Sequence, residues 1–177
     1  MTSLLIRPYR PADAPALRAL FHASVHGLAS AHYTPAQLAA WAPAAYDAAQ
    51  WAARMQANQP FVAWATATQG AGAVAGFADL QANGYIDMFF VAPAHARQGV
   101  ARALMAHVHQ EAAALSIARL WAHVSLAAEP FFAAQGFVVE ERQEVERAGV
   151  VLRNARMAKA LVAYSSGPAN AHPRPTP

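Results

Sequence analysis

One stretch of the sequence restricts the fold more than any other, because an apolar strand, a short loop and a helix follow one another between residues 85 and 104. Residues Tyr85 to Val91 are apolar on both faces apart from Asp87, which predicts a continuous strand in the centre of a sheet. The next helix is expected from Gly99 to Leu115, since apolar residues recur there at helical spacing. A helix N-terminus therefore lies directly beyond a buried strand.

A helix N-terminus in this position has the properties of an anion site. Its first N–H groups have no partner within the helix, and they lie at the positive end of the helix dipole. Gly99 and Ala101 allow a ligand to approach the backbone closely, and Arg97 and Arg102 add positive charge. The pattern favours a pyrophosphate site. The nucleotide-binding motifs GxGxxG and GxxxxGK(S/T) are absent, and an ordinary strand-to-helix connection explains the pattern equally well.

The remaining sequence alternates between strand and helix patterns. Strands are expected at residues 4–9, 61–68, 73–80, 119–125, 137–146 and 149–160. Helices are expected at residues 13–27, 34–41, 47–57 and 129–135. Asp13 is a suitable N-cap for the first of these helices, and Gly27 is expected to end it. Thr34 and Gln37 form a capping box. Glycine-containing turns are expected at residues 69–72, 83–84 and 148–149.

These elements predict a single α/β (α+β) domain over residues 1–164, in which a mixed sheet is flanked by helices. Hydrophobic residues make up 56% of the 177 residues and charged residues only 13%, which is typical of one compact core. Residues 165–177 hold four prolines and no apolar periodicity, which predicts a disordered tail.

The composition and the N-terminal sequence exclude several kinds of site. The sequence has no cysteine, so it forms no disulfide, thiolate zinc site, iron–sulfur centre or cysteine nucleophile. Only three consecutive large apolar residues precede Arg7, too few for a signal peptide, so a cytoplasmic location is expected. Residues 55–78 carry no charge, but polar residues and Pro60 interrupt them, so no membrane span is expected.

Positive charge is spread along the chain. The formal net charge is +3, and 12 of the 13 basic residues are arginines between Arg7 and Arg174, the other being Lys159. A nucleic-acid-binding protein gathers its basic residues on one element, so no nucleic-acid partner is expected. Arginine suits bidentate contacts to oxyanions, which makes a phosphate-bearing small molecule as plausible a ligand as a polyanion.

The strand, loop and helix resemble motif A of the GNAT superfamily of N-acetyltransferases. In that motif, a strand ending in Val-x-Pro precedes a (Gln/Arg)-x-x-Gly-x-(Gly/Ala) turn. Here Val91 to Pro93 precede the turn Ala96 to Ala101, in which Ala96 replaces the usual glutamine or arginine. The order of elements is also similar to that of the superfamily over residues 3–160.

A second segment, Ser125 to Phe137, resembles motif B of the same superfamily. Ser125 stands where asparagine is usual, and Phe132 stands where a general-acid tyrosine is usual. Residues 32–41 and 85–91 further resemble the YafP-like bacterial branch of the superfamily.

The resemblance implies a mostly antiparallel sheet and an N-acetyltransferase that uses acetyl-CoA. The pantetheine arm is expected to pair with the backbone of Phe89, Phe90 and Val91, with the N–H of Val91 bound to the thioester carbonyl oxygen. Ser125 is also expected to contact the cofactor. The pyrophosphate is expected on the N–H groups of the turn and the helix start, which are Arg97, Gln98, Gly99, Val100, Ala101 and Arg102.

Transfer to an amine needs a base for the ammonium proton and a proton or hydrogen bond for the departing thiolate. Asp87 is either a base that acts through water or a structural acid paired with an arginine or backbone groups. His123 shares a strand face with Ser125 and is either a base or a core histidine bonded to backbone. Phe132 has no hydroxyl with which to protonate the departing thiolate. Ser125, Tyr85 or water is expected to supply the proton or hydrogen bond instead, or the thiolate leaves unassisted.

The acceptor is expected to be a primary amine on a small molecule or a peptide. Candidate acceptor-binding residues are His32, Tyr33, Trp41 and Tyr85, although packing explains the aromatic cluster equally well. No metal site is expected, since His22 and His26 have no evident carboxylate ligand nearby.

Direct attack in a ternary complex is the simplest route, because no cysteine is present to form an acetyl intermediate. The alternative function is a non-catalytic acyl-CoA-binding or sensing module. The protein is expected to be a monomer or a homodimer.

Overall fold

The computed structural model describes residues 3–66 and 72–161. The strands are β1 (Ser3–Pro8), β2 (Phe61–Thr66), β3 (Ala73–Ala78), β4 (Tyr85–Ile86), β5 (Phe89–Val91), β6 (Arg119–Ser125), β7 (Val138–Arg147) and β8 (Val150–Ala160). The helices are α1 (Ala14–Leu28), α2 (Pro35–Trp41), α3 (Ala48–Asn58), α4 (Val100–Ala114) and α5 (Glu129–Ala134), with short 3-10 helices at Pro11–Asp13 and Pro93–His95. The disordered tail predicted for residues 165–177 and the predicted turn at residues 69–71 lie outside the described residues.

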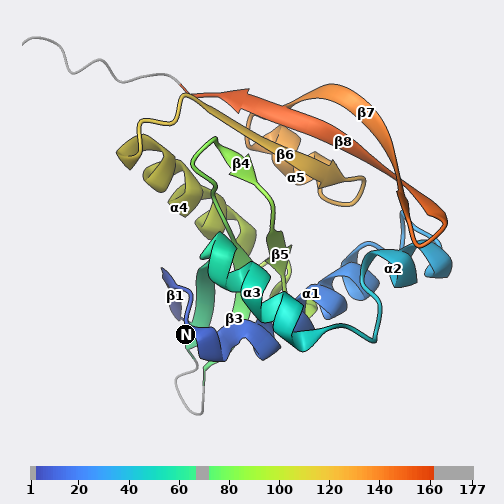
Figure 1. The fold of residues 1–177 in the computed structure, drawn as a ribbon. Coiled ribbons are helices and arrows are strands. Elements are labelled where there is room, and N and C mark those ends of the chain that lie inside the picture. Colours follow the sequence, from blue (N-terminus) through green and yellow to red (C-terminus); the bar gives the residue numbers. More distant parts are fainter. Residues whose placement is uncertain (1–2, 67–71, 162–177) are drawn as a thin grey trace, which may run out of the picture.

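The strands form two sheets that part in the middle of the molecule (Figure 1). The first sheet has the order β1-β2-β3-β5 and is antiparallel throughout. The second has the order β4-β6-β8-β7 and is antiparallel except for the parallel pair β4 and β6. The prediction of a mixed, mostly antiparallel sheet flanked by helices is confirmed.

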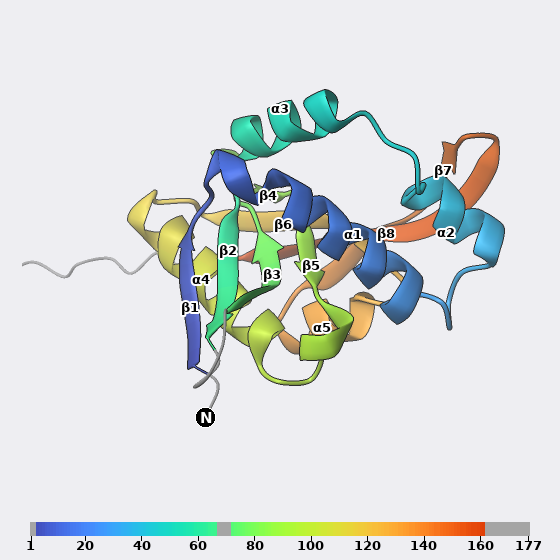
Figure 2. The ribbon, with the colours of Figure 1, turned by 90° about the horizontal axis from the view of Figure 1, so that it is seen from below.

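Helices cover both faces of the first sheet (Figure 2). Between the sheet and α1 and α3 lies one apolar core, whose larger members include Leu17, Phe21, Met55 and Phe77. Between the other face, α4 and the second sheet lies another core, whose larger members include Leu104, Met105, Leu120 and Met157. Burial of these side chains fixes the two sheets against α4.

The prediction of a continuous strand from Tyr85 to Val91 is wrong. The chain leaves the second sheet after Ile86 and enters the first sheet at Phe89. The reason is Asp79, which is fully buried and whose Oδ1 accepts the N–H groups of Asp87 at 2.8 Å and Met88 at 3.0 Å. These two N–H groups are thereby satisfied outside either sheet, and β5 pairs with β3 while β6 stays apart from it.

The predicted helix signals have different outcomes. The capping box before α2 is confirmed, since the Gln37 N–H donates to Thr34 Oγ1 at 3.3 Å and the Thr34 N–H donates to Gln37 Oε1 at 2.9 Å. Asp13 precedes α1, but its carboxylate binds the Arg7 guanidinium and the Arg10 N–H instead of capping that helix. Gly27 does not end α1, which continues to Leu28.

The titration of Asp79 gives a testable dependence of stability on pH. Burial raises the pKa of Asp79 from 3.8 to about 6. Between these values the folded protein holds a proton that the unfolded chain has released, so the free energy of unfolding falls as pH rises. We expect the wild type to lose about 2 kcal/mol relative to Asp79→Asn between about pH 4 and about pH 7. Urea unfolding of both proteins at several pH values measures this, and a constant difference would contradict it.

Candidate active site

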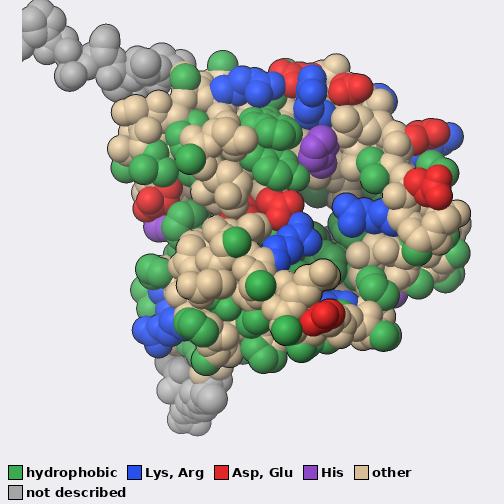
Figure 3. Space-filling view, in the orientation of Figure 1, with side chains coloured by type: hydrophobic (Ala, Val, Ile, Leu, Met, Phe, Trp, Pro, Cys, Tyr) green, Lys and Arg blue, Asp and Glu red, His purple; other side chains and the backbone are tan. Residues whose placement is uncertain are grey.

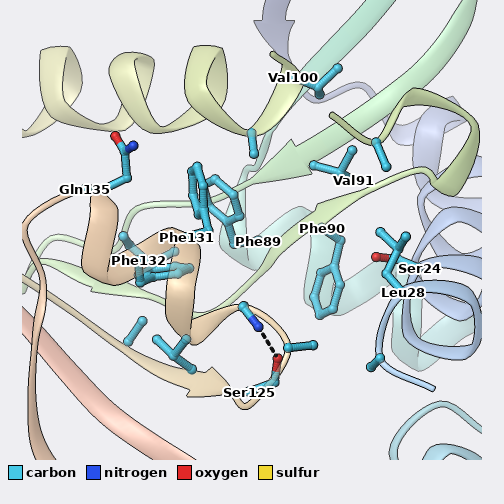
Figure 4. A pocket seen from close by; sticks show the side chains of 18 of the residues that line it. Ser24, Leu28, Phe89, Phe90, Val91, Val100, Ser125, Phe131, Phe132 and Gln135 are labelled. Carbon is cyan, nitrogen blue, oxygen red and sulfur yellow. Dashed lines mark hydrogen bonds between the residues drawn. The ribbon is translucent and has the colours of Figure 1, made fainter. Parts of the chain in front are cut away.

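A cavity of about 600 Å³ lies where the two sheets part. Its walls come from α1, β5, the start of α4, β6 and α5, and Figure 4 shows Phe89, Phe90 and Val91 of β5 facing Ser24, Leu28, Phe131 and Phe132. Figure 3 shows the hollow between the two halves of the molecule, with acidic, basic and histidine side chains at its rim. This cavity is a consequence of the break between β4 and β5, because the break separates the two sheets.

The edge of β5 that faces the cavity has unpaired backbone groups. The Ala92 N–H donates to Ala75 O at 2.8 Å, and the Asp79 N–H donates to Met88 O at 3.0 Å. The residues directly before and after β5 are therefore hydrogen-bonded to β3 and to the residue that follows it. Backbone groups alternate in direction along a strand. Therefore the N–H and C=O of Phe89 and Val91 point away from β3, toward β6 and the cavity.

The N-terminus of α4 forms the opposite end of the cavity. The first helical hydrogen bond runs from the Ala103 N–H to Gly99 O at 3.0 Å, which leaves the preceding N–H groups without a partner inside the helix. Gly99 has φ +85, a conformation that favours glycine, and a Cβ there would meet nothing within 4 Å. Arg97 and Arg102 both line the cavity. This end of the cavity suits an anionic group.

Asp87 lies at the far side of the cavity, within a network of polar side chains. Its Oδ2 accepts Arg54 Nη2 at 2.7 Å, Arg54 Nε at 3.2 Å and Asn58 Nδ2 at 2.8 Å. Its Oδ1 accepts the Tyr85 hydroxyl at 3.3 Å. Asn58 Nδ2 also donates to Asp79 Oδ2 at 2.5 Å, so one amide bridges two carboxylates. Burial and Asp87 raise the pKa of Tyr85 to about 12, so this phenol remains a donor at neutral pH.

His123 is exposed at the cavity wall and lies beside two aromatic rings. Its ring makes edge contacts with Tyr85 and Trp121, with centroids 5.7 Å apart in both pairs. Its Nδ1 lies 2.8 Å from Gln143 Oε1 on β7. The sequence-based alternative of a core histidine bonded to backbone does not fit this exposed position and side-chain partner.

Ser125 and Phe132 lie on the α5 side of the cavity. Ser125 Oγ accepts the Ala128 N–H at 3.3 Å, as Figure 4 shows, and this bond leaves the hydroxyl proton free to be donated. Phe132 is buried against the rings of Phe89 and Phe137. The position at which the family usually has a tyrosine is therefore filled by an apolar ring.

The structure separates the predicted acceptor-binding residues. Trp41 lines the cavity, whereas His32 and Tyr33 line a second hollow beside Arg153. The Tyr33 hydroxyl donates to Arg153 O at 2.6 Å and accepts the Leu126 N–H at 3.0 Å. These bonds give Tyr33 a packing role that joins the turn before α2 to β8.

Sequence reasoning missed four residues of the site: Arg54, Asn58, Asp79 and Gln143. A signal existed for Asp79, the sole charged residue of the predicted strand at 73–80. Within residues 3–66 and 72–161, no group of three or more histidine, aspartate or glutamate side chains is arranged to hold a metal ion. No helix in the same ranges is long and apolar enough to cross a membrane.

Comparisons with known proteins agree with this geometry. A family model described as an acetyltransferase (GNAT) domain matches residues 29–161. YafP of Escherichia coli (strain K12), an uncharacterised N-acetyltransferase, is 34% identical over 157 residues, which cover 89% of this chain and 96% of YafP.

Solved structures have the same fold. A GCN5-related N-acetyltransferase from Rhodopseudomonas palustris is 34% identical, with a TM-score of 0.81 over 90% of this chain and 96% of that one. PaiA N-acetyltransferase from Thermoplasma acidophilum, solved with coenzyme A, is 16% identical, with a TM-score of 0.67 over 90% of this chain and 99% of that one.

Two parted strands beside a helix start that suits an anion form a cavity in which a coenzyme A thioester can bind. The chain belongs to the GNAT family of acetyltransferases. It is an N-acetyltransferase by class, with acetyl-CoA as the donor. The membership predicted from its two motifs is confirmed.

The anion-binding role of the α4 N-terminus is tested by Gly99→Glu. A carboxylate beside the pyrophosphate position repels it, so we expect the Kd for acetyl-CoA to rise more than about tenfold in isothermal titration calorimetry. Gly149→Glu is the matched control, because Gly149 also has positive φ and open space around it but lies in the β7–β8 turn. Equal affinity in both variants would contradict the assignment.

Proposed function

We propose that the protein transfers the acetyl group of acetyl-CoA directly to a primary amine while both substrates are bound. One observation carries this proposal: a single cavity extends from the N-terminus of α4 to Asp87 and His123. A donor at one end and an acceptor at the other meet in the gap between β5 and β6. The absence of cysteine supports direct attack, because no acetyl-cysteine intermediate can form.

The donor is proposed to bind mainly to backbone groups. Its pantetheine arm lies along the free edge of β5, and its pyrophosphate lies on the N–H groups of residues 97–102. The direction of the Val91 N–H, toward the gap, supports its role as donor to the carbonyl oxygen as negative charge develops there. Backbone N–H groups exist whatever the side chain, which explains how Ala96 is tolerated at the start of the motif.

His123 is the proposed base. Asp87 is less available, because its Oδ2 accepts three N–H groups and its Oδ1 accepts the Tyr85 hydroxyl. In the proposed step, the amine nitrogen bonds to the thioester carbon while its proton passes to His123 Nε2. The C–S bond then breaks, and the departing thiolate accepts a hydrogen bond from Ser125 Oγ.

The acceptor is proposed to be a small molecule or a peptide that enters beside Tyr85 and Trp41. Trp41 lines the cavity together with Leu28, and these two side chains supply an apolar wall opposite the polar one. The predictions of a cytoplasmic location and of a monomer or homodimer stay predictions.

The roles of the two ionisable groups are tested by His123→Ala and Asp87→Asn. We expect His123→Ala to lower kcat/KM by about 10² to 10⁴-fold and to remove the fall in rate at acid pH, because the base is lost. Asp87→Asn should retain that fall. The assay reads coenzyme A release with a thiol reagent, and the protein adds no thiol signal of its own because the chain has no cysteine.

Two outcomes would contradict this account. If Asp87→Asn removes the fall in rate at acid pH and His123→Ala does not, Asp87 is the base. If wild-type protein binds acetyl-CoA but releases no coenzyme A with a broad panel of amines and peptides, the protein is the non-catalytic binding module instead.

A further inference from the structure

The side chain of His123 has a hydrogen-bond partner two strands away. In the second sheet β8 lies between β6 and β7, and Arg156 of β8 is the register partner of both His123 and Glu141. Gln143 of β7 is the register partner of Asn154 and reaches across β8, so that its Oε1 lies 2.8 Å from His123 Nδ1. This contact joins the edge strand of the sheet to the proposed base.

A second hydrogen bond supports the orientation of the Gln143 amide. Gln143 Nε2 donates to Glu141 Oε2 at 3.3 Å, and Arg156 Nη1 lies 3.8 Å from the same oxygen. An ionised carboxylate only accepts hydrogen bonds, so the NH₂ group of the amide faces Glu141. The amide oxygen therefore faces His123.

An amide oxygen also only accepts hydrogen bonds, so the neutral ring of His123 carries its proton on Nδ1 and a lone pair on Nε2. We propose that Gln143 and Glu141 are positioning residues that hold His123 in this tautomer for acetyl transfer. The inference rests on the proposed function, because it gives His123 the role of base.

The tautomer matters because Gln143 occupies one of the two ring nitrogens, Nδ1. Nδ1 is turned toward β7, so Nε2 is the atom that takes the proton of the acceptor. A neutral imidazole without a fixed partner places its proton on either nitrogen, and a molecule with the proton on Nε2 is inactive as a base. The titratable or charged groups around the ring are Tyr85 of β4, Arg156 of β8 and Glu141 of β7, with Asp87 one hydrogen bond further away.

The tautomer is measurable from the ¹⁵N chemical shifts of the histidine rings in the labelled full-length protein. At a pH where the ring is neutral, we expect the shift of a protonated nitrogen for His123 Nδ1 and of an unprotonated nitrogen for Nε2. The spectrum of His123→Ala identifies the signals, because they disappear from it. A wild-type spectrum with the proton on Nε2 would overturn the proposal, whatever the activity.

Two substitutions at Gln143 then test the function of the contact. Gln143→Met retains the length of the side chain but not the acceptor, so we expect mixed tautomers and a kcat lower by about tenfold, with an unchanged KM for acetyl-CoA. Gln143→Glu retains an acceptor, so we expect the wild-type tautomer. In this variant the fall in rate at acid pH should begin at a higher pH, because a carboxylate beside the His123 ring favours the protonated form of the ring. Gln110→Met, at an exposed position of α4, is the matched control.

The outcomes separate this inference from the proposed function. An unchanged tautomer in Gln143→Met would overturn the inference, whether or not the activity falls. Full activity of His123→Ala would overturn the role of His123 as base, even where the spectra have the expected tautomer. If Gln143→Met fails to fold, the wild-type spectrum and the pH profile of Gln143→Glu still decide the question.

Discussion

One buried carboxylate determines where the two sheets part. Asp79 accepts the N–H groups of Asp87 and Met88, and so stabilises the two residues at which the chain leaves the second sheet and enters the first. Left without an acceptor in the interior, each of these groups would cost about 1 to 3 kcal/mol. Because β5 is held against β3 and away from β6, a strand edge stays free and the cavity exists. The proposed donor site and the proposed acceptor site both depend on this opening.

The same carboxylate organises the polar end of the cavity. Asp79 and Asp87 share the amide of Asn58, and Arg54 supplies the positive charge that offsets the repulsion between them. This arrangement explains how two acidic residues lie close together in a largely apolar interior. The Asp87 carboxylate accepts hydrogen bonds from Arg54, Asn58 and Tyr85, and for this reason we propose His123 as the ionisable group that is available to the acceptor.

Local signals in the sequence were sufficient for much of the fold. The capping box at Thr34 and Gln37, the strand at 119–125 and the helix that starts after Gly99 each follow from residues close together in the chain. The break at Asp87 was not predictable in this way, since its cause is Asp79, which lies eight residues earlier, directly after the end of β3. The partner of His123 was missed for a similar reason. Gln143 reaches it only because β6, β8 and β7 lie side by side.

We propose that the gap between β5 and β6 holds the donor with its thioester between Val91 and His123. A crystal structure with acetyl-CoA tests this most directly. We expect the pyrophosphate on the N–H groups of residues 97–102, the thioester carbonyl oxygen about 3 Å from the Val91 N–H, and His123 Nε2 on the acceptor side of the thioester. A thioester bound outside the gap, or a Val91 N–H that points away from it, would contradict this binding mode.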